Sequence, residues 1–92
     1  MALQWLFDVI EDRKKNPTEK SYTTSLFKDG LPKIAQKVGE EGTEVVIAAL
    51  AQDDQRLVEE IADLTYHTLV LLSARGLTPK HIRAELEKRH KE

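Results

Sequence analysis

Two acidic motifs lie at equal distances from a predicted turn in the middle of the chain. The first, Glu-Glu-x-x-Glu, covers residues 40–44, and the second, Glu-x-x-Asp, covers residues 60–63. Both occur in segments whose apolar residues recur at helical spacing, and this spacing breaks at residues 52–54. The chain is therefore predicted to form an antiparallel helical hairpin that brings the two motifs to the same level.

Four carboxylates are expected to meet in this hairpin. Residues equally far from the turn lie side by side, which places Glu44 beside Glu60 and Glu41 beside Asp63. Within each helix, residues three apart share a face, with Cβ atoms about 5–6 Å from each other. Like charges so close repel unless a cation lies between them, so a metal site is predicted. Glu59 is expected to lie outside it, because it points about 100° away from Glu60.

The ligand atoms indicate which metal this site would take. Carboxylate oxygens favour Mg²⁺, with Mn²⁺ as an alternative, over zinc or copper. The chain has no cysteine, which excludes thiolate metal sites and cysteine nucleophiles. A di-iron bundle site would need Glu-x-x-His motifs, and the sequence has none. A single glutamate on a helix is usually only solvated, but the clustering and symmetry of the four acids favour a site.

The apolar periodicity predicts an all-α, four-helix bundle-like unit that occupies residues 1–92 as one domain. Helices are expected at about residues 2–15, 32–50, 54–74 and 79–91, with a polar connection at residues 17–30. Trp5 and Phe7 are expected in the core. Leu26 and Phe27 are expected to anchor the polar connection to it.

The third predicted helix also suggests self-association. Residues 65–74 are apolar almost all round, which is more surface than one unit of 92 residues is expected to hide. We therefore expect a homo-oligomer, at least a dimer.

The composition of the chain bears on whether it binds nucleic acid or a membrane and on its location in the cell. The formal net charge of −2 argues against duplex nucleic acid as the main partner. The sequence shows no signal-peptide pattern and no apolar run long enough to span a bilayer. A cytoplasmic location without a membrane partner is the expectation.

The residues around the acidic motifs resemble those of a known family. The motifs alone are similar to the signature of the all-α, MazG-like nucleoside triphosphate pyrophosphohydrolases. The flanking residues narrow the resemblance to phosphoribosyl-ATP pyrophosphohydrolase, over essentially the whole chain. These residues are Ser21-Tyr22-Thr23, Leu26, Gly30, the run Lys-Ile-Ala-Gln-Lys-Val-Gly-Glu-Glu at 33–41, Ala62-Asp63-Leu64, Tyr66-His67, Leu71-Leu72 and Arg75-Gly76-Leu77. Gly42 and Thr65 depart from the family's pattern, where alanine and leucine are usual, and neither is an expected ligand.

The resemblance implies an enzyme of histidine biosynthesis that hydrolyses phosphoribosyl-ATP to phosphoribosyl-AMP and pyrophosphate. Water would attack between the α- and β-phosphates with the help of Mg²⁺. The implied roles are metal ligand for Glu41, Glu44, Glu60 and Asp63, general base for Glu40, phosphate contact for Lys37 and Lys33, and substrate contact for Ser21, Tyr22 and Thr23. His67 lies one turn after Asp63 and is expected either to contact the substrate or to be a hydrogen-bonded packing residue.

Two other functions fit parts of the pattern. The first keeps the fold and the chemistry but acts on a different nucleoside triphosphate. The second is a helical interaction or antitoxin-like module whose acids bind a basic partner. That module predicts no dependence on divalent metal, and the symmetric placement of the acids argues against it.

Overall fold

The computed structural model describes residues 3–90, and this part of the chain forms five α-helices. They are α1 (Gln4–Lys15), α2 (Tyr22–Asp29), α3 (Leu31–Ala51), α4 (Asp54–Ala74) and α5 (Pro79–Arg89). No strand occurs within residues 3–90, so the prediction of an all-α fold is confirmed. None of the helices described is both long and apolar enough to cross a membrane.

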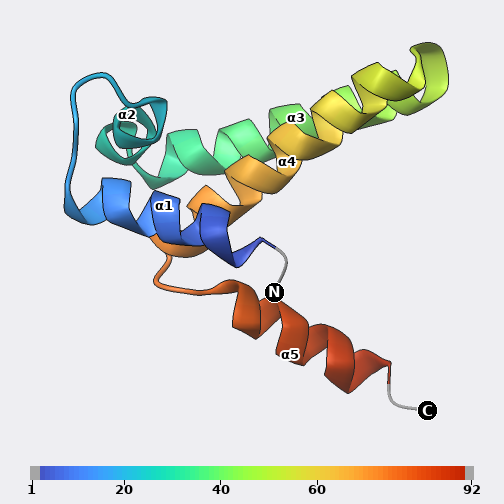
Figure 1. Ribbon diagram of the computed structural model, residues 1–92. Helices are drawn as coiled ribbons and strands as arrows, with labels where there is room; N and C mark the ends of the chain where they lie inside the picture. The colour runs from blue at the N-terminus through green and yellow to red at the C-terminus, as the bar shows by residue number, and fades with distance from the viewer. Residues whose placement is uncertain (1–2, 91–92) are drawn as a thin grey trace.

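The two longest helices determine the shape of the molecule. α3 and α4 lie side by side, and the end at which they are joined projects away from the other helices (Figure 1). We call this projecting part, residues 44–61, the arm. α1 and α2 pack against the other end of the pair, while α5 extends separately from the C-terminal end of α4 (Figure 1). One end of the helix pair is thus packed, and the arm is open to solvent.

The turn at the tip of the arm is short because α4 has its own cap. The side chain of Asp53 accepts a hydrogen bond of 2.9 Å from the backbone N–H of Arg56, which is a common way to begin a helix. α4 then runs from Asp54 to Ala74, the bounds that the sequence predicts. α3 passes through Gly39 and Gly42 without a break.

The expected count of four helices is wrong, because part of the polar connection is helical. Tyr22–Asp29 forms α2, and the hydroxyl of Ser21 caps it by accepting a bond of 3.2 Å from the N–H of Thr24. Threonine-rich segments have low intrinsic helix propensity, so tertiary packing determines the conformation here. Leu26 is 2% exposed and Phe27 packs against the core, which confirms that these residues anchor the segment.

The core lies where α1, α2 and the packed halves of α3 and α4 meet. Its buried members are Phe7, Ile10, Leu26, Ile34, Leu69, Val70 and Leu72. The prediction for Phe7 is confirmed, but the prediction for Trp5 is wrong, since that side chain is 64% exposed. Trp5 lies two positions before Phe7, about 200° around α1, so the two residues cannot face the same core.

Large apolar side chains remain exposed on the arm. Their exposed fractions are 56% for Val46, 49% for Ile47, 84% for Leu50, 60% for Val58 and 46% for Ile61. By contrast, much of the apolar second half of α4 is buried within the chain. The most exposed large apolar side chain, Leu50, is therefore on the arm, whereas residues 65–74 are more fully covered than expected.

Candidate metal centre and active site

Three carboxylates converge where α3 and α4 face each other. Oxygen atoms of Glu41, Glu60 and Asp63 all lie within 4.8 Å of one another. Glu41 is 6% exposed and Glu60 is 5% exposed, while Asp63 is open to solvent. One oxygen of each buried residue, Oε2, is buried and has no hydrogen-bond partner within residues 3–90. Leaving such charged acceptors unpaired is costly, so the donor set fits a divalent cation.

Glu44 lies against this group from one turn further along α3. Hydrogen bonding with the carboxyl of Glu41, and secondly with that of Glu60, favours the protonated form of Glu44, and the negative charges of both neighbours add to the effect. These contacts raise the pKa of Glu44 to about 7. Carboxyl groups that share a proton in this way are placed to share a cation instead. Of the four expected ligands, the structure thus brings three together, and the fourth, Glu44, lies near enough to two of them for its pKa to be raised.

The basic and catalytic candidates on α3 flank the cluster on the side of the core. Lys37 Nζ is 3.4 Å from Glu41 Oε1 and 3.5 Å from Glu40 Oε1. The side chain of Gln36 donates to Glu40 at 2.9 Å, and this bond, with smaller contributions from Lys37 and Lys33, lowers the pKa of Glu40. Glu40 is therefore ionised at neutral pH and can accept a proton. Lys33 is exposed.

His67 connects α2 to the carboxylate cluster. Its Nδ1 lies 2.8 Å from the backbone carbonyl oxygen of Asp63, and its Nε2 lies 3.2 Å from the Tyr22 hydroxyl. A carbonyl only accepts, so Nδ1 carries the proton and, in the neutral ring, Nε2 accepts from the tyrosine. His67 is 5% exposed. Its position supports the hydrogen-bonded packing role directly and leaves any contact with substrate to Tyr22.

The three expected substrate residues of α2 have different surroundings. Ser21 uses its hydroxyl to cap the helix, as described above. Thr23 is buried, and its hydroxyl is hydrogen bonded to the hydroxyl of Tyr66 on α4. Tyr22 is 53% exposed, and its ring stacks on that of Tyr66 with centroids 6.2 Å apart. Tyr22 is thus the member of this segment whose side chain is open to a ligand.

Comparison with known proteins places this site in a family. Residues 3–90 match the family described as phosphoribosyl-ATP pyrophosphohydrolase. This range includes all four acidic residues of the cluster and every other expected site residue.

The chain belongs to this family.

Individual members of the phosphoribosyl-ATP pyrophosphohydrolase family are similar over most of the chain. A phosphoribosyl-ATP pyrophosphatase of Clostridium botulinum is 54% identical over 84 residues, 91% of this chain and 76% of the relative. One from Sulfolobus acidocaldarius is 50% identical over 86 residues, 94% of this chain and 90% of the relative. A histidine biosynthesis bifunctional protein of Oceanobacillus iheyensis is 51% identical over 83 residues, 90% of this chain but 39% of that protein.

Sequence reasoning missed Arg56, which the structure places beside the carboxylates of this pyrophosphohydrolase. Its Nη2 donates to Glu60 Oε1 at 2.6 Å, and its Nη1 donates to Glu59. Glu59 is exposed and lies outside the group of three convergent carboxylates, in agreement with its predicted direction. The i, i+4 spacing of Arg56 and Glu60 was the available signal. Such pairs are common on solvated helix faces, so the spacing alone does not mark a site.

Proposed function

We propose that this chain hydrolyses phosphoribosyl-ATP to phosphoribosyl-AMP and pyrophosphate, the second step of histidine biosynthesis. The observation that carries the proposal is the pair of buried carboxylate oxygens of Glu41 and Glu60, beside Asp63, which have no partner in the described part of the chain. Membership of the family supports phosphoribosyl-ATP as the substrate, and the carboxylate donor set supports metal-assisted hydrolysis as the reaction. The chain would act as a single domain in the cytoplasm, on a small nucleotide and not on nucleic acid.

The metal would be held by Glu41, Glu44, Glu60 and Asp63. Mg²⁺ suits these oxygen donors, and Mn²⁺ is the alternative. A bound divalent cation neutralises phosphate charge and polarises the oxygens that it contacts. A bound cation would also give the two unpaired buried oxygens a counter-charge.

The side chains around the cluster would accept a proton, contact the phosphates and position Tyr22. Glu40 accepts the proton of the attacking water, whose oxygen forms a bond to phosphorus as the bridge between the α- and β-phosphates breaks. Lys37 and Lys33 supply positive charge to the phosphates. His67 holds Tyr22 in place.

The segment before and within α2 would contact the rest of the substrate. Tyr22 offers an exposed ring and hydroxyl. Ser21 and Thr23 determine where that ring lies, because the first caps α2 and the second is bonded to Tyr66.

The active form would contain at least two copies of the chain. The exposed apolar side chains of the arm support this proposal, since a large uncovered apolar surface marks an interface. The second copy would cover exposed apolar side chains of the arm such as Val46, Leu50 and Val58.

A pyrophosphate-release assay tests the proposed function. Phosphoribosyl-ATP should be hydrolysed in millimolar Mg²⁺ and not in excess chelator, while a panel of ordinary and modified nucleoside triphosphates should be poor substrates. Faster turnover of a panel member would assign the chain to the alternative MazG-like activity. Equal rates with magnesium and with chelator would contradict the metal site itself.

A further inference from the structure

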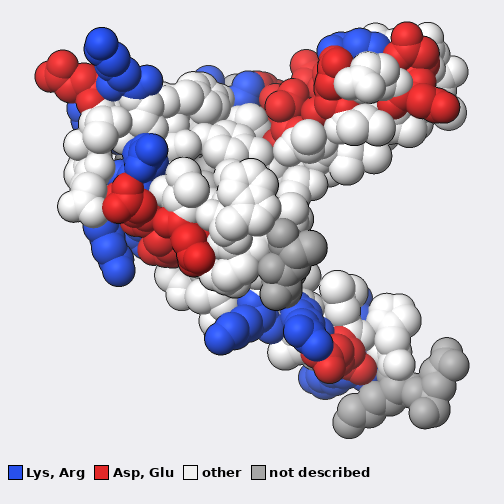
Figure 2. All heavy atoms as spheres, in the orientation of Figure 1, with Lys and Arg blue, Asp and Glu red and all other residues white. Residues whose placement is uncertain are grey.

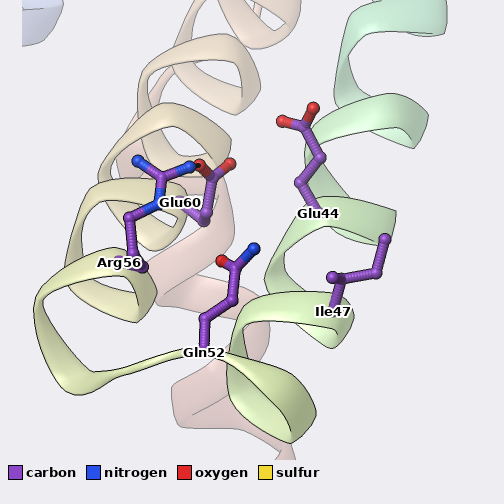
Figure 3. Close-up of a pocket in the computed structure, with 5 residues that line it drawn as sticks. All are labelled: Glu44, Ile47, Gln52, Arg56 and Glu60. Carbon is purple, nitrogen blue, oxygen red and sulfur yellow. Dashed lines mark hydrogen bonds and ion pairs between the residues drawn. The ribbon is translucent and has the colours of Figure 1, made fainter.

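A hollow of about 200 Å³ lies next to the carboxylates, toward the tip of the arm. It is lined by Glu44 and Ile47 of α3, Gln52 at the turn, and Arg56 and Glu60 of α4 (Figure 3). In Figure 3 the guanidinium of Arg56 lies beside the carboxylate of Glu60, and the amide of Gln52 extends toward them from below. The lining thus combines acids that belong to the metal site with hydrogen-bond donors that do not.

Positive groups flank the acidic cluster at both ends along the helix axes. Lys37 contacts Glu41 on the side of the core, and Arg56 contacts Glu60 on the side of the tip. Lys37 is on α3, and Arg56 on α4 lies level with residue 48 of α3 because the two positions are equally far from the turn. At about 1.5 Å per residue, roughly 16 Å of helix axis therefore separates the two levels. Figure 2 shows acidic side chains gathered on the arm and fewer basic ones among them. A ligand with several negative charges in a row could therefore contact positive charge on either side of the cluster.

The ion pair between Arg56 and Glu60 depends on the negative charge of Glu60. Glu60 is 5% exposed, and its Oε2 finds no hydrogen-bond partner among the residues that the structure describes. When a divalent cation takes up that charge, the positive charge of Arg56 is balanced by the exposed Glu59 alone, to which Nη1 donates, and Nη2 is released toward the hollow. A guanidinium carries five N–H donors in a planar fork that matches phosphate oxygens.

We propose that this hollow binds the two terminal phosphoryl groups of the substrate and, after cleavage, inorganic pyrophosphate. Arg56 is the charged ligand, and Gln52 is a second donor. The inference rests on the proposed function, because that function supplies a ligand with a triphosphate. Binding in the hollow would also orient the substrate, with its terminal phosphates toward the tip of the arm and its nucleoside toward Lys37 and Tyr22.

Binding of inorganic pyrophosphate in the presence of saturating Mg²⁺ tests the proposal without turnover. In a calorimetric titration, Arg56→Gln should weaken pyrophosphate binding by at least about tenfold, the scale expected when a hydrogen bond from a charged group is lost. Gln52→Ala should weaken it less. Mg²⁺ alone should bind Arg56→Gln as tightly as the parent or more tightly, because a competing cation has been removed.

A matched control and a product comparison sharpen the experiment. Arg83→Gln removes an exposed arginine from an equivalent i, i+4 pair with Glu87 on α5, at 3.0 Å, and should leave pyrophosphate binding unchanged. Phosphoribosyl-AMP should inhibit the parent and Arg56→Gln equally, whereas pyrophosphate should inhibit Arg56→Gln more weakly. Partial recovery of pyrophosphate binding in Arg56→Lys would show that a positive charge at this position is needed for binding and that a protein substituted here still folds.

Two results would overturn the proposal. If Arg56 only neutralises Glu60, Arg56→Gln will change the affinity for Mg²⁺ while pyrophosphate binds as in the parent. Equal weakening by Arg83→Gln would instead indicate a general charge effect. Failure of the proposed function is distinct from both, since the parent would then release no pyrophosphate from phosphoribosyl-ATP.

Discussion

Glu44 is the residue whose protonation should depend most directly on a bound metal. Its pKa is raised to about 7, first by the hydrogen bond with Glu41 and then by the hydrogen bond with Glu60. Its ordinary value is 4.5, so between about pH 4.5 and about 7 the folded chain binds more protons than the unfolded chain. The linkage relation then requires the free energy of unfolding to fall as the pH rises through this range.

This leads to the first prediction. In chelator, the melting temperature should fall between about pH 4.5 and about 7 by an amount that Glu44→Gln removes. Saturating Mg²⁺ should raise the melting temperature, and more so above pH 7, because cation and proton compete for the same oxygens. Thermal melts over pH 4–9, in chelator and in Mg²⁺, measure how the melting temperature changes with pH in each condition. An unchanged slope in Glu44→Gln would show that another group is responsible.

The second prediction separates ligands from supporting residues. Glu44→Gln and Asp63→Asn retain volume and hydrogen-bonding capacity but remove charge from the cluster. Without metal, both variants should be as stable as the parent or slightly more stable, since repulsion is relieved. Turnover of phosphoribosyl-ATP should fall at least about 10²-fold, the usual scale for a positioned catalytic group.

The control for these variants is a glutamate remote from the site. Glu85 is exposed on α5 and pairs with Arg89 at 2.9 Å, so Glu85→Gln should retain parental turnover. Glu59 is unsuitable, because it binds Arg56. Similar losses in Glu85→Gln and the cluster variants would indicate a general electrostatic effect and contradict the ligand assignment.

The carboxylate cluster could be predicted from the sequence because it depends only on helix geometry. The i, i+3 step and the position of the turn fix the levels of Glu41, Glu60 and Asp63 before any packing is known. The role of Arg56 could not be predicted in this way. It depends on Glu60 being buried and Glu59 being exposed. Which of them is buried depends on which faces of α3 and α4 are in contact.

At the scale of the helices, α2 is the element that local sequence patterns do not predict. α4 carries a capping Asp53 and a long apolar repeat, so its bounds follow from local signals. α2 is eight residues long, and three of these are Thr or Ser. Its helical state depends on the cap at Ser21 and on the burial of Leu26, which is a tertiary contact. Isolated helices of this length are not stable in water.

The third prediction concerns that cap. Ser21→Ala should lower the free energy of unfolding by about 0.5–2 kcal/mol, the range measured for losing an N-cap side chain. Ser21→Asp should restore stability, because its carboxylate can accept the same bond from the N–H of Thr24. Urea titrations of the three proteins provide the comparison.

Steady-state kinetics of the same variants decide whether the Ser21 hydroxyl also touches substrate. If its role is to position Tyr22, Ser21→Asp should recover KM together with stability. Recovery of stability without recovery of KM would mean that the hydroxyl contacts the substrate directly. Thr24→Ala is not a useful control, because its hydroxyl accepts a separate bond of 3.1 Å from the N–H of Thr18.

At the scale of the whole molecule, the distribution of apolar surface differs from the sequence-based expectation. The apolar residues 65–74 suggested an interface because the helix is apolar nearly all round. In the structure, α1 packs on α4, and Leu69, Val70 and Leu72 are buried within the chain. An apolar groove of about 260 Å³ remains between α4 and α5, lined by Leu64, Thr65, Thr68, Leu69, Leu72, Pro79 and Ile82. Which surfaces are covered depends on the tertiary arrangement, and sequence periodicity does not contain that information.

The arm gives the last prediction, which is that the chain associates in solution. Val46, Leu50 and Val58 are each more than half exposed on a pair of helices that no other part of the chain covers within residues 3–90. Burying them against a second copy would stabilise both, at about 25 cal/mol for each Å² of apolar surface removed from water. Light scattering at micromolar concentration should therefore give at least twice the mass of 10.5 kDa.

Leu50→Glu tests whether the arm is the surface responsible. Leu50 is 84% exposed, so a charge there should leave the fold of one chain intact while it disfavours burial against a second copy. The variant should retain its helical circular dichroism and shift toward the monomer mass on dilution. Trp5→Glu is the matched control, because Trp5 is 64% exposed on α1, away from the arm. A parent that scatters as a monomer would refute self-association. Dissociation caused by Trp5→Glu but not by Leu50→Glu would place the interface on α1 instead.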